Sequence, residues 1–127
     1  MENKIFTLHK TVTEADTAAH VGSGSLPVLA TPVLIAWMEA AACGCCAGLM
    51  EEGTTSVGTE MNMRHTAASP VGMKVTVTAE LTAVDGRIFS FKVYAEDTAG
   101  AIGEGSHTRA IIRAKRFMEK ANAKLAQ

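Results

Sequence analysis

The chain has 127 residues and a mass of 13.3 kDa, which suits one compact domain and leaves little room for two. Hydrophobic residues make up 47% and charged residues 20%, so the chain can bury a core and is not expected to be disordered. The formal net charge is −1 and no basic tract stands out, which argues against nucleic acid as the main partner. We therefore expect a single domain over residues 1–127.

The amino terminus and the cysteines favour a cytoplasmic protein without cofactors. The opening MENKIFTLHK has no apolar core followed by a cleavage site, so no secretory signal is expected. All three cysteines lie in Cys43–Cys46 and cannot form a disulfide framework. They also lack a fourth zinc ligand, and no G-x-G-x-x-G precedes a helix. We expect small packing thiols, no metal and no nucleotide redox cofactor.

The first third of the chain predicts a short strand, a loop and a long helix. Lys4–Val12 is rich in residues that favour strands, and Thr13–Pro27 is polar and glycine-containing and predicts a loop. Thr31 followed by Pro32 predicts a helix start, with Thr31 as the N-cap. The helix is expected to run to about Met50.

This helix is apolar on nearly all faces, so a membrane span has to be considered. The segment is long enough to cross a bilayer, but Glu39 would then lie near the bilayer centre at a cost of about 2.5–3.5 kcal/mol. Its flanks lack Lys and Arg. We therefore expect a buried helix, wrapped by other elements, and no membrane partner.

Alternating sequence after the helix predicts four antiparallel strands. They cover 54–66, 74–84, 87–96 and 101–112, and a basic helix over 114–127 follows. In 74–84 the apolar face is expected to comprise Val75, Val77, Ala79, Leu81 and Ala83. The fold class is therefore α+β: one antiparallel sheet of about five strands curled around a central helix, the hot-dog architecture. Its edge strands favour a homodimer or a dimer of dimers.

Thr31, Glu39 and His65 form the candidate catalytic set. Glu39 is the only carboxylate in a helix expected to be buried, which makes it a candidate acid or base unless it lies on a wet face or pairs with a distant Arg such as Arg109. Thr31 lies two turns earlier, at about 80° in direction, so the two could face one cleft without touching. N-capping is the structural alternative for Thr31, and a solvated strand end is the alternative for His65.

Gly58 is a candidate binding position on the first strand after the helix. A glycine there lets a ligand approach the main chain, and its N–H could polarise a carbonyl group. A bulge, or a crossing with the helix, explains the glycine equally well. Phe89, Phe91 and Trp37 are expected to belong to the core.

With these residues in place, the chain resembles the hot-dog acyl-CoA thioesterases of the fluoroacetyl-CoA thioesterase type. The resemblance covers almost the whole chain past residue 15. It rests on the spacing of Thr31, Glu39 and His65 and on a series of short motifs: Ala30-Thr31, Met38-Glu39, Val57-Gly58-Thr59, His65-Thr66-Ala67-Ala68-Ser69-Pro70, Val75-Thr76-Val77-Thr78-Ala79-Glu80-Leu81, and Gly103-Glu104-Gly105-Ser106-His107-Thr108-Arg109.

The resemblance implies hydrolysis of short-chain acyl-CoA thioesters at a site formed at a dimer interface, to which the second chain could contribute His65. His65 would act as general base or acid, held by Glu39, and Thr31 would activate or join the attack on the thioester carbonyl. Gly58 would hold the carbonyl oxygen, and Arg109 is a substrate or network partner. Fluoroacetyl selectivity is not implied, because the selective enzyme carries an aromatic lid where 21–27 has no aromatic residue.

Three other readings remain open. The chain could bind acyl-CoA without turning it over, as a sensor or carrier-like module. It could be a hydratase, although those enzymes use an Asp followed five residues later by His, and Asp16 to His20 is one residue short. It could also be a structural dimerisation domain.

Overall fold

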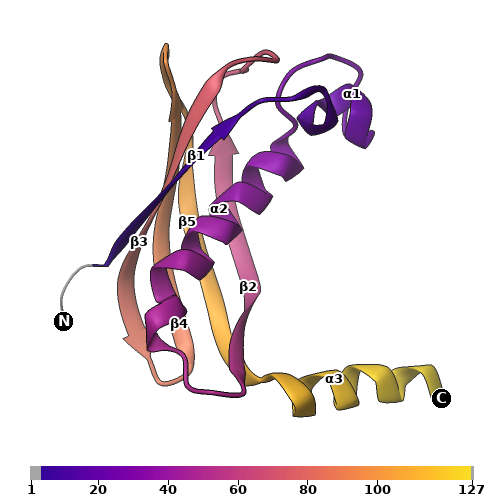
Figure 1. The fold of residues 1–127 in the computed structure, drawn as a ribbon, viewed down its shortest axis with the longest axis vertical. Helices are drawn as coiled ribbons and strands as arrows, with labels where there is room; N and C mark the ends of the chain where they lie inside the picture. Colours follow the sequence, from indigo (N-terminus) through magenta and orange to yellow (C-terminus); the bar gives the residue numbers. More distant parts are fainter. Residues whose placement is uncertain (1–3, 127) are drawn as a thin grey trace.

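The computed structural model describes residues 4–126 and shows an antiparallel sheet curved around one long helix, α2 (Figure 1). The second α-helix and the five strands make up most of the fold, and the elements follow in this order: β1 (Ile5–Thr11), η1 (Glu14–Asp16), α1 (Ala18–Val21), α2 (Thr31–Cys46), η2 (Ala47–Leu49), β2 (Thr54–His65), β3 (Lys74–Asp85), β4 (Ile88–Asp97), β5 (Gly100–Arg113), α3 (Ala114–Ala123) and η3 (Lys124–Ala126). The expected hot-dog architecture is confirmed, and the expected strands change only at their ends.

The five strands have the spatial order β1-β3-β4-β5-β2, so β1 and β2 are the two edges. Helix α2 packs mainly on β3 and β1. At the other edge, β2 pairs with β5, and this pairing places Gly58 opposite Arg109. The outer edge of β2 therefore presents unpaired backbone groups, as edge strands do.

Helix α2 is buried on one face only, which corrects the expectation of a helix wrapped on most sides. The face on the sheet comprises Leu34, Trp37, Met38, Ala41, Ala42, Cys45 and Cys46. Pro32, Ala36, Ala40 and Cys43 are exposed. Thr31–Leu49 has a mean hydropathy of 1.5 and the length of a membrane span, a property that core helices share. Here the helix lies across the sheet.

The start of α2 differs from the prediction in a way that matters for the site. Ala30, with extended backbone (φ −73°, ψ 139°), is the N-cap, and Thr31 is the first helical residue. The N-capping interpretation of Thr31 is therefore wrong, and its hydroxyl is free for another partner. The predicted loop over 13–27 also contains two short helical turns, η1 and α1, because Thr13 and Asp16 form a capping box and Thr17 caps α1.

The predicted core face of β3 is correct except at one residue. Val75, Val77, Ala79 and Leu81 are buried, but Ala83 is exposed. A register shift between Leu81 and Ala83 places an extra residue in the strand, and such a bulge reverses the alternation of faces beyond it. The aromatic residues Phe89, Phe91 and Trp37 are buried, as predicted.

Candidate active site

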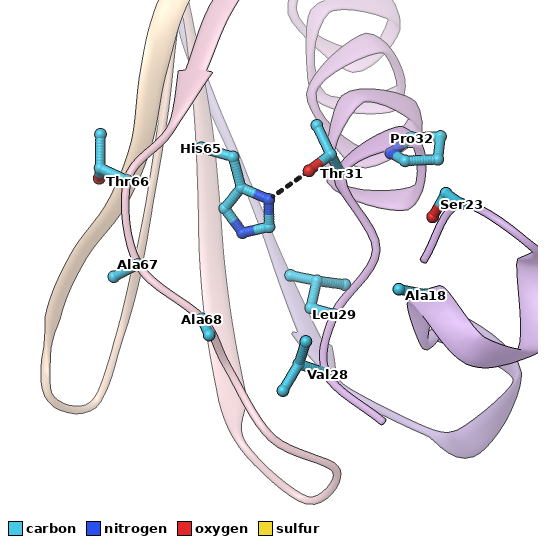
Figure 2. Close-up of a pocket in the computed structure, with 10 residues that line it drawn as sticks. All are labelled: Ala18, Ser23, Val28, Leu29, Thr31, Pro32, His65, Thr66, Ala67 and Ala68. Atoms are coloured by element: carbon cyan, nitrogen blue, oxygen red, sulfur yellow. Dashed lines mark hydrogen bonds between the residues drawn. The ribbon is translucent and has the colours of Figure 1, made fainter. Parts of the chain in front are cut away.

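Thr31 and His65 meet where the first turn of α2 faces the end of β2. The Thr31 Oγ1 atom lies 2.8 Å from His65 Nδ1 (Figure 2). A hydroxyl beside an imidazole nitrogen at this distance is the arrangement in which the ring can take or return the hydroxyl proton. The structure thus brings together two of the three predicted catalytic residues from positions 34 residues apart.

The second ring nitrogen of His65 has no partner. Nε2 is buried and accepts or donates no hydrogen bond within residues 4–126. In Figure 2 it points away from Thr31, to the side of Ala68. Burial lowers the pKa of His65 below its ordinary value, and the nearby Ala67 backbone opposes this shift only in part. The ring is therefore neutral at pH 7, and one of its nitrogens is available to a substrate, a water or a second chain.

A cavity of about 410 Å³ opens beside this pair (Figure 2). Its lining is mostly small or aliphatic and contains no aromatic residue: Ala18, Ser23, Val28, Leu29, Thr31, Pro32, His65, Thr66, Ala67 and Ala68. Ser23 comes from the glycine- and serine-containing segment before α2, so this segment forms one wall of the cavity and contributes no aromatic side chain to it. The cavity can hold a small acyl group next to both reactive side chains.

Glu39 lies apart from this pair. Its Oε2 atom is 3.6 Å from Arg109 NH1, and its side chain is 42% exposed against 7% for Arg109. Two turns of helix, about 12 Å, separate it from Thr31. No hydrogen bond or ion pair joins Glu39 to His65 in the part of the chain that the structure describes. The expectation of a buried carboxylate is wrong for the single chain, whereas the pairing with Arg109 is found.

Arg109 is held on several sides by groups of its own chain. Its Nε donates to Ser56 Oγ at 2.8 Å, and NH2 donates to the Ser56 carbonyl at 3.0 Å. NH1 lies 3.2 Å from His107 Nε2 and faces Glu39. A guanidinium with these partners has little capacity left for a ligand, so the geometry favours Arg109 as a network residue over a direct substrate contact.

Gly58 provides the space in which this network meets the helix. A Cβ atom at this position would lie 2.5 Å from Glu39 Oε2, 3.2 Å from His107 Cε1 and 3.3 Å from Arg109 NH1. The glycine also precedes a register shift between 58 and 60. Both structural alternatives for Gly58, a bulge and a crossing with the helix, are therefore found, and a binding role for its N–H stays a prediction.

His107 is the site residue that the sequence analysis missed. Its ring is 2% exposed and lies between the Glu60 carbonyl and Arg109. The available signal was its position: His107 and Arg109 are two residues apart on β5, so both side chains project from the same face of the sheet. A polar pair on the face that packs against the core needs internal partners.

Two of the three cysteines agree with the packing interpretation, and the exposed Cys43 does not. Cys45 and Cys46 are buried and Cys43 is exposed, and all three are free thiols. Burial raises the pKa of Cys45 and of Cys46, which keeps them protonated. Within residues 4–126, no cluster of three or more His, Cys, Asp or Glu side chains could hold a metal ion.

Comparisons with known proteins place this geometry in a family. A family model described as FlK, fluoroacetyl-CoA-specific thioesterase, matches residues 12–115. A fluoroacetyl-CoA thioesterase of Streptantibioticus cattleyicolor is 45% identical over 100 residues, which are 79% of this chain and 69% of that protein.

Two solved structures of the FlK thioesterase agree with the fold. One has a TM-score of 0.92 at 37% identity and covers 98% of this chain and 97% of its own. The other, a variant solved in complex with fluoroacetate and CoA, has a TM-score of 0.87 at 37% identity and covers 92% of this chain and 99% of its own. The chain therefore belongs to the fluoroacetyl-CoA-specific thioesterase (FlK) family of hot-dog proteins.

Proposed function

We propose that the chain hydrolyses acyl-CoA thioesters to a free acid and CoA, with a preference for short acyl groups. The observation that carries the proposal is the 2.8 Å contact between Thr31 Oγ1 and His65 Nδ1 beside an open cavity. Membership of the family supports it, as does the name of the Streptantibioticus relative, whose substrate carries a two-carbon acyl group.

His65 acts as the base and then as the acid. It removes a proton from Thr31 or from a water, the resulting oxygen attacks the thioester carbon, and the proton is returned to the departing CoA sulfur. Where Thr31 is the attacking group, a water that His65 deprotonates then attacks the Thr31 ester, and the proton goes back to the Thr31 oxygen as the acid leaves. Neutral His65 is needed for the first step, and burial keeps it neutral at pH 7. Gly58 lies beside Glu39 and outside this cavity, so the N–H that would polarise the carbonyl oxygen is that of Gly58 in a second copy of the chain. Mass spectrometry of enzyme quenched during turnover distinguishes an acyl group on Thr31 from direct attack by water.

The complete site is formed by two copies of the chain. Within one copy Glu39 does not reach His65, yet Glu39 is part-exposed and His65 Nε2 has no partner in the described part of the chain. Strand β2 is an edge of the sheet, and the exposed residues of α2, such as Pro32, Ala36 and Ala40, carry no charge. We place the β2 strands of the two copies side by side and antiparallel, related by a two-fold axis, with Gly58 of one copy opposite His65 of the other. Residues 58–65 of one copy then pair with residues 65–58 of the second. Glu39 of one copy would then lie near the His65 ring of the other.

Release of thiol tests the activity. Purified protein is mixed with acyl-CoA thioesters from acetyl to medium chain length, and CoA is followed with a chromogenic thiol reagent. Turnover that is fastest with short acyl groups supports the proposal. Tight binding of acyl-CoA without thiol release would instead indicate a sensor or carrier-like module.

Light scattering tests the dimer. We expect twice the 13.3 kDa chain mass at micromolar concentration. Ala40→Lys places a charge on the exposed face of α2 and should shift the protein toward the monomer, with loss of activity. Ala15→Lys, on the exposed turn η1, is the matched control and should leave both unchanged. A wild-type monomer with full activity would contradict the two-copy site.

The cytoplasm is the proposed compartment. Free thiols at Cys43, Cys45 and Cys46 suit a reducing environment, and acyl-CoA substrates would be encountered there. Fractionation of cells that produce the protein with its native amino terminus tests this.

A further inference from the structure

We propose that His107 is a positioning residue, which holds Arg109 against Glu39 through a neutral ring whose proton is on Nδ1. The inference deepens the proposed function and rests on it, because Glu39 is one of the three residues assigned to the reaction. His107 itself reaches neither the cavity lining nor Thr31, so its role is exerted through Arg109.

The two contacts of the His107 ring admit one tautomer. Nδ1 lies 2.7 Å from the Glu60 carbonyl oxygen, which can only accept, so Nδ1 must carry a proton. Nε2 lies 3.2 Å from Arg109 NH1, which can only donate, so Nε2 must offer a lone pair. A proton on Nε2 would set two donors against each other beside a cation. Only the neutral Nδ1–H ring satisfies both partners.

The strand irregularity in β2 supplies the carbonyl that fixes this tautomer. The register shifts between Gly58 and Glu60, and Thr59 is the additional residue. Its hydroxyl lies 2.7 Å from the Thr108 hydroxyl, which fastens the bulge to β5. Bulges disrupt the ladder locally and free backbone groups for other partners. Here the Glu60 carbonyl is directed at the ring of His107.

The remaining surroundings keep the ring in place and uncharged. Phe91 is opposite His107 in the β4–β5 pairing, and the two ring centroids are 6.1 Å apart. Burial lowers the pKa of His107, with Arg109 acting in the same direction and the Glu60 carbonyl and Glu39 against it. The ring is thus neutral at pH 7, as the tautomer argument requires.

The position of Glu39 depends on this chain of contacts. Ser56 fixes one side of the guanidinium through Nε and NH2, and His107 fixes NH1. NH1 is the atom that faces Glu39 Oε2, at 3.6 Å. Without His107 as acceptor, Arg109 NH1 loses one of its hydrogen-bond partners in a buried site, and the guanidinium can rotate about its contacts with Ser56. The carboxylate then loses the cation that orients it.

Ring nitrogen NMR of the full-length protein, with ¹⁵N-labelled histidine, tests the tautomer without any activity measurement. We expect His107 as the neutral Nδ1–H form at pH 7, assigned by the loss of its signals in His107→Gln. A neutral Nε2–H ring or an imidazolium at pH 7 would overturn the proposal. The NMR measurement does not depend on catalysis. If the wild-type protein releases no thiol, the proposed function is wrong, and the tautomer of His107 still decides whether its ring accepts from Arg109.

Variant kinetics test the positioning role. His107→Leu should lower kcat by about 10–100-fold with KM changed less than about threefold, whereas His107→Gln, whose amide oxygen can still accept from Arg109, should recover much of the loss. In a Glu39→Gln background, His107→Leu should have less than about a twofold further effect. Equal losses in both backgrounds, or Gln no better than Leu, would show a structural role only. His9→Leu, on the exposed strand β1, is the control.

Discussion

The two polar clusters of this protein differ in how completely their hydrogen-bonding groups are used. At one end of α2, Thr31 and His65 make one contact with each other, and His65 Nε2 has no partner among residues 4–126. Opposite the middle of α2, Arg109 and His107 on β5 each have two or more polar partners, and Glu39 on the helix completes this second cluster. A buried polar atom without a partner is costly, so it marks a position where something else is meant to bind.

The difference suggests a division of work. A group that transfers protons must be able to change its partners during the reaction, and His65 has that freedom. A group that fixes geometry is most effective when its own partners leave it one orientation, as they do for Arg109. The predictions below separate these two kinds of role, in order of expected effect.

Removing the proton-transfer group should have the largest effect. His65→Ala should lower kcat/KM by about 10²–10⁴, the usual range for loss of a general acid or base. His9→Ala, an exposed histidine on β1, should leave the rate unchanged. Steady-state kinetics on both variants, with circular dichroism to show that they fold, make the comparison. A folded His65→Ala protein that retains the wild-type kcat/KM would contradict the role of His65 as general acid or base.

Crowding the second cluster should have a smaller effect. Gly58→Ala places a Cβ atom 2.5 Å from Glu39 Oε2, so the carboxylate must move. We expect kcat to fall by up to about 10²-fold, since misplacement of a catalytic group by about 1 Å can cost that much. Overpacking should also lower the free energy of unfolding by about 1–3 kcal/mol.

Gly48→Ala is the matched control for this substitution. The nearest atom to its Cβ would be Lys4 Nζ, the end of a flexible side chain, at 3.5 Å. Neither kcat nor the midpoint of chemical denaturation should fall. If Gly58→Ala is as harmless as Gly48→Ala, the close approach of Glu39 to the backbone has no functional role.

The pH dependence should show the burial of His65. Burial lowers its pKa below the ordinary 6.5, so the acid limb of kcat/KM should have its midpoint below pH 6.5. Because the unfolded chain binds the proton more readily, this histidine contributes stability above pH 6.5 that is lost as pH falls through the pKa of the folded state. Between pH 7.5 and 5, the free energy of unfolding from chemical denaturation should decrease less in His65→Gln than in wild type. An acid limb above pH 6.5 would mean that a nearby carboxylate, such as Glu39 of the second copy, favours the charged ring more than burial disfavours it.

Selectivity between similar acyl groups should be the smallest effect. Ser23 lines the cavity, and no aromatic residue lies in 21–27. A whole methylene is worth only about 10–200-fold in an apolar pocket and a fluorine in place of a hydrogen is a smaller change, so fluoroacetyl-CoA and acetyl-CoA should differ by no more than about 10-fold in direct competition. Ser23→Phe should change this ratio, and Ser25→Phe, which is outside the cavity lining, should not. A preference of about 10⁴ or more in wild type would place selectivity in the chemistry around Thr31 and His65.

Local patterns in the sequence predicted most of the fold. Alternation over 74–81 and 89–95 predicted buried faces that the structure confirms, because a strand with one face on a core repeats every second residue. The alternation failed at Ala83, where a bulge intervenes. Bulges depend on how two strands align, and neither strand alone contains that information.

The candidate site divides in the same manner. Spacing and residue type singled out Thr31, Glu39, His65 and Gly58, and they named Arg109 as a possible partner of Glu39, which the structure confirms. The family resemblance added Arg109 to the candidate site. They could not show that Thr31 begins the helix with its hydroxyl directed at His65, because the N-cap depends on the backbone angles of Ala30. His107 was passed over because its role requires a carbonyl from another strand.

The sequence by itself determined the period of each element, the single long apolar helix and the residue types available for chemistry, since these depend on neighbours along the chain. Only the tertiary structure decided which of these groups meet. Thr31 reaches His65, Glu39 reaches Arg109, and His107 reaches Glu60 across 34, 70 and 47 positions of sequence. Such contacts are fixed by how β2 and β5 align and by where α2 crosses the sheet, and both depend on packing of the whole core.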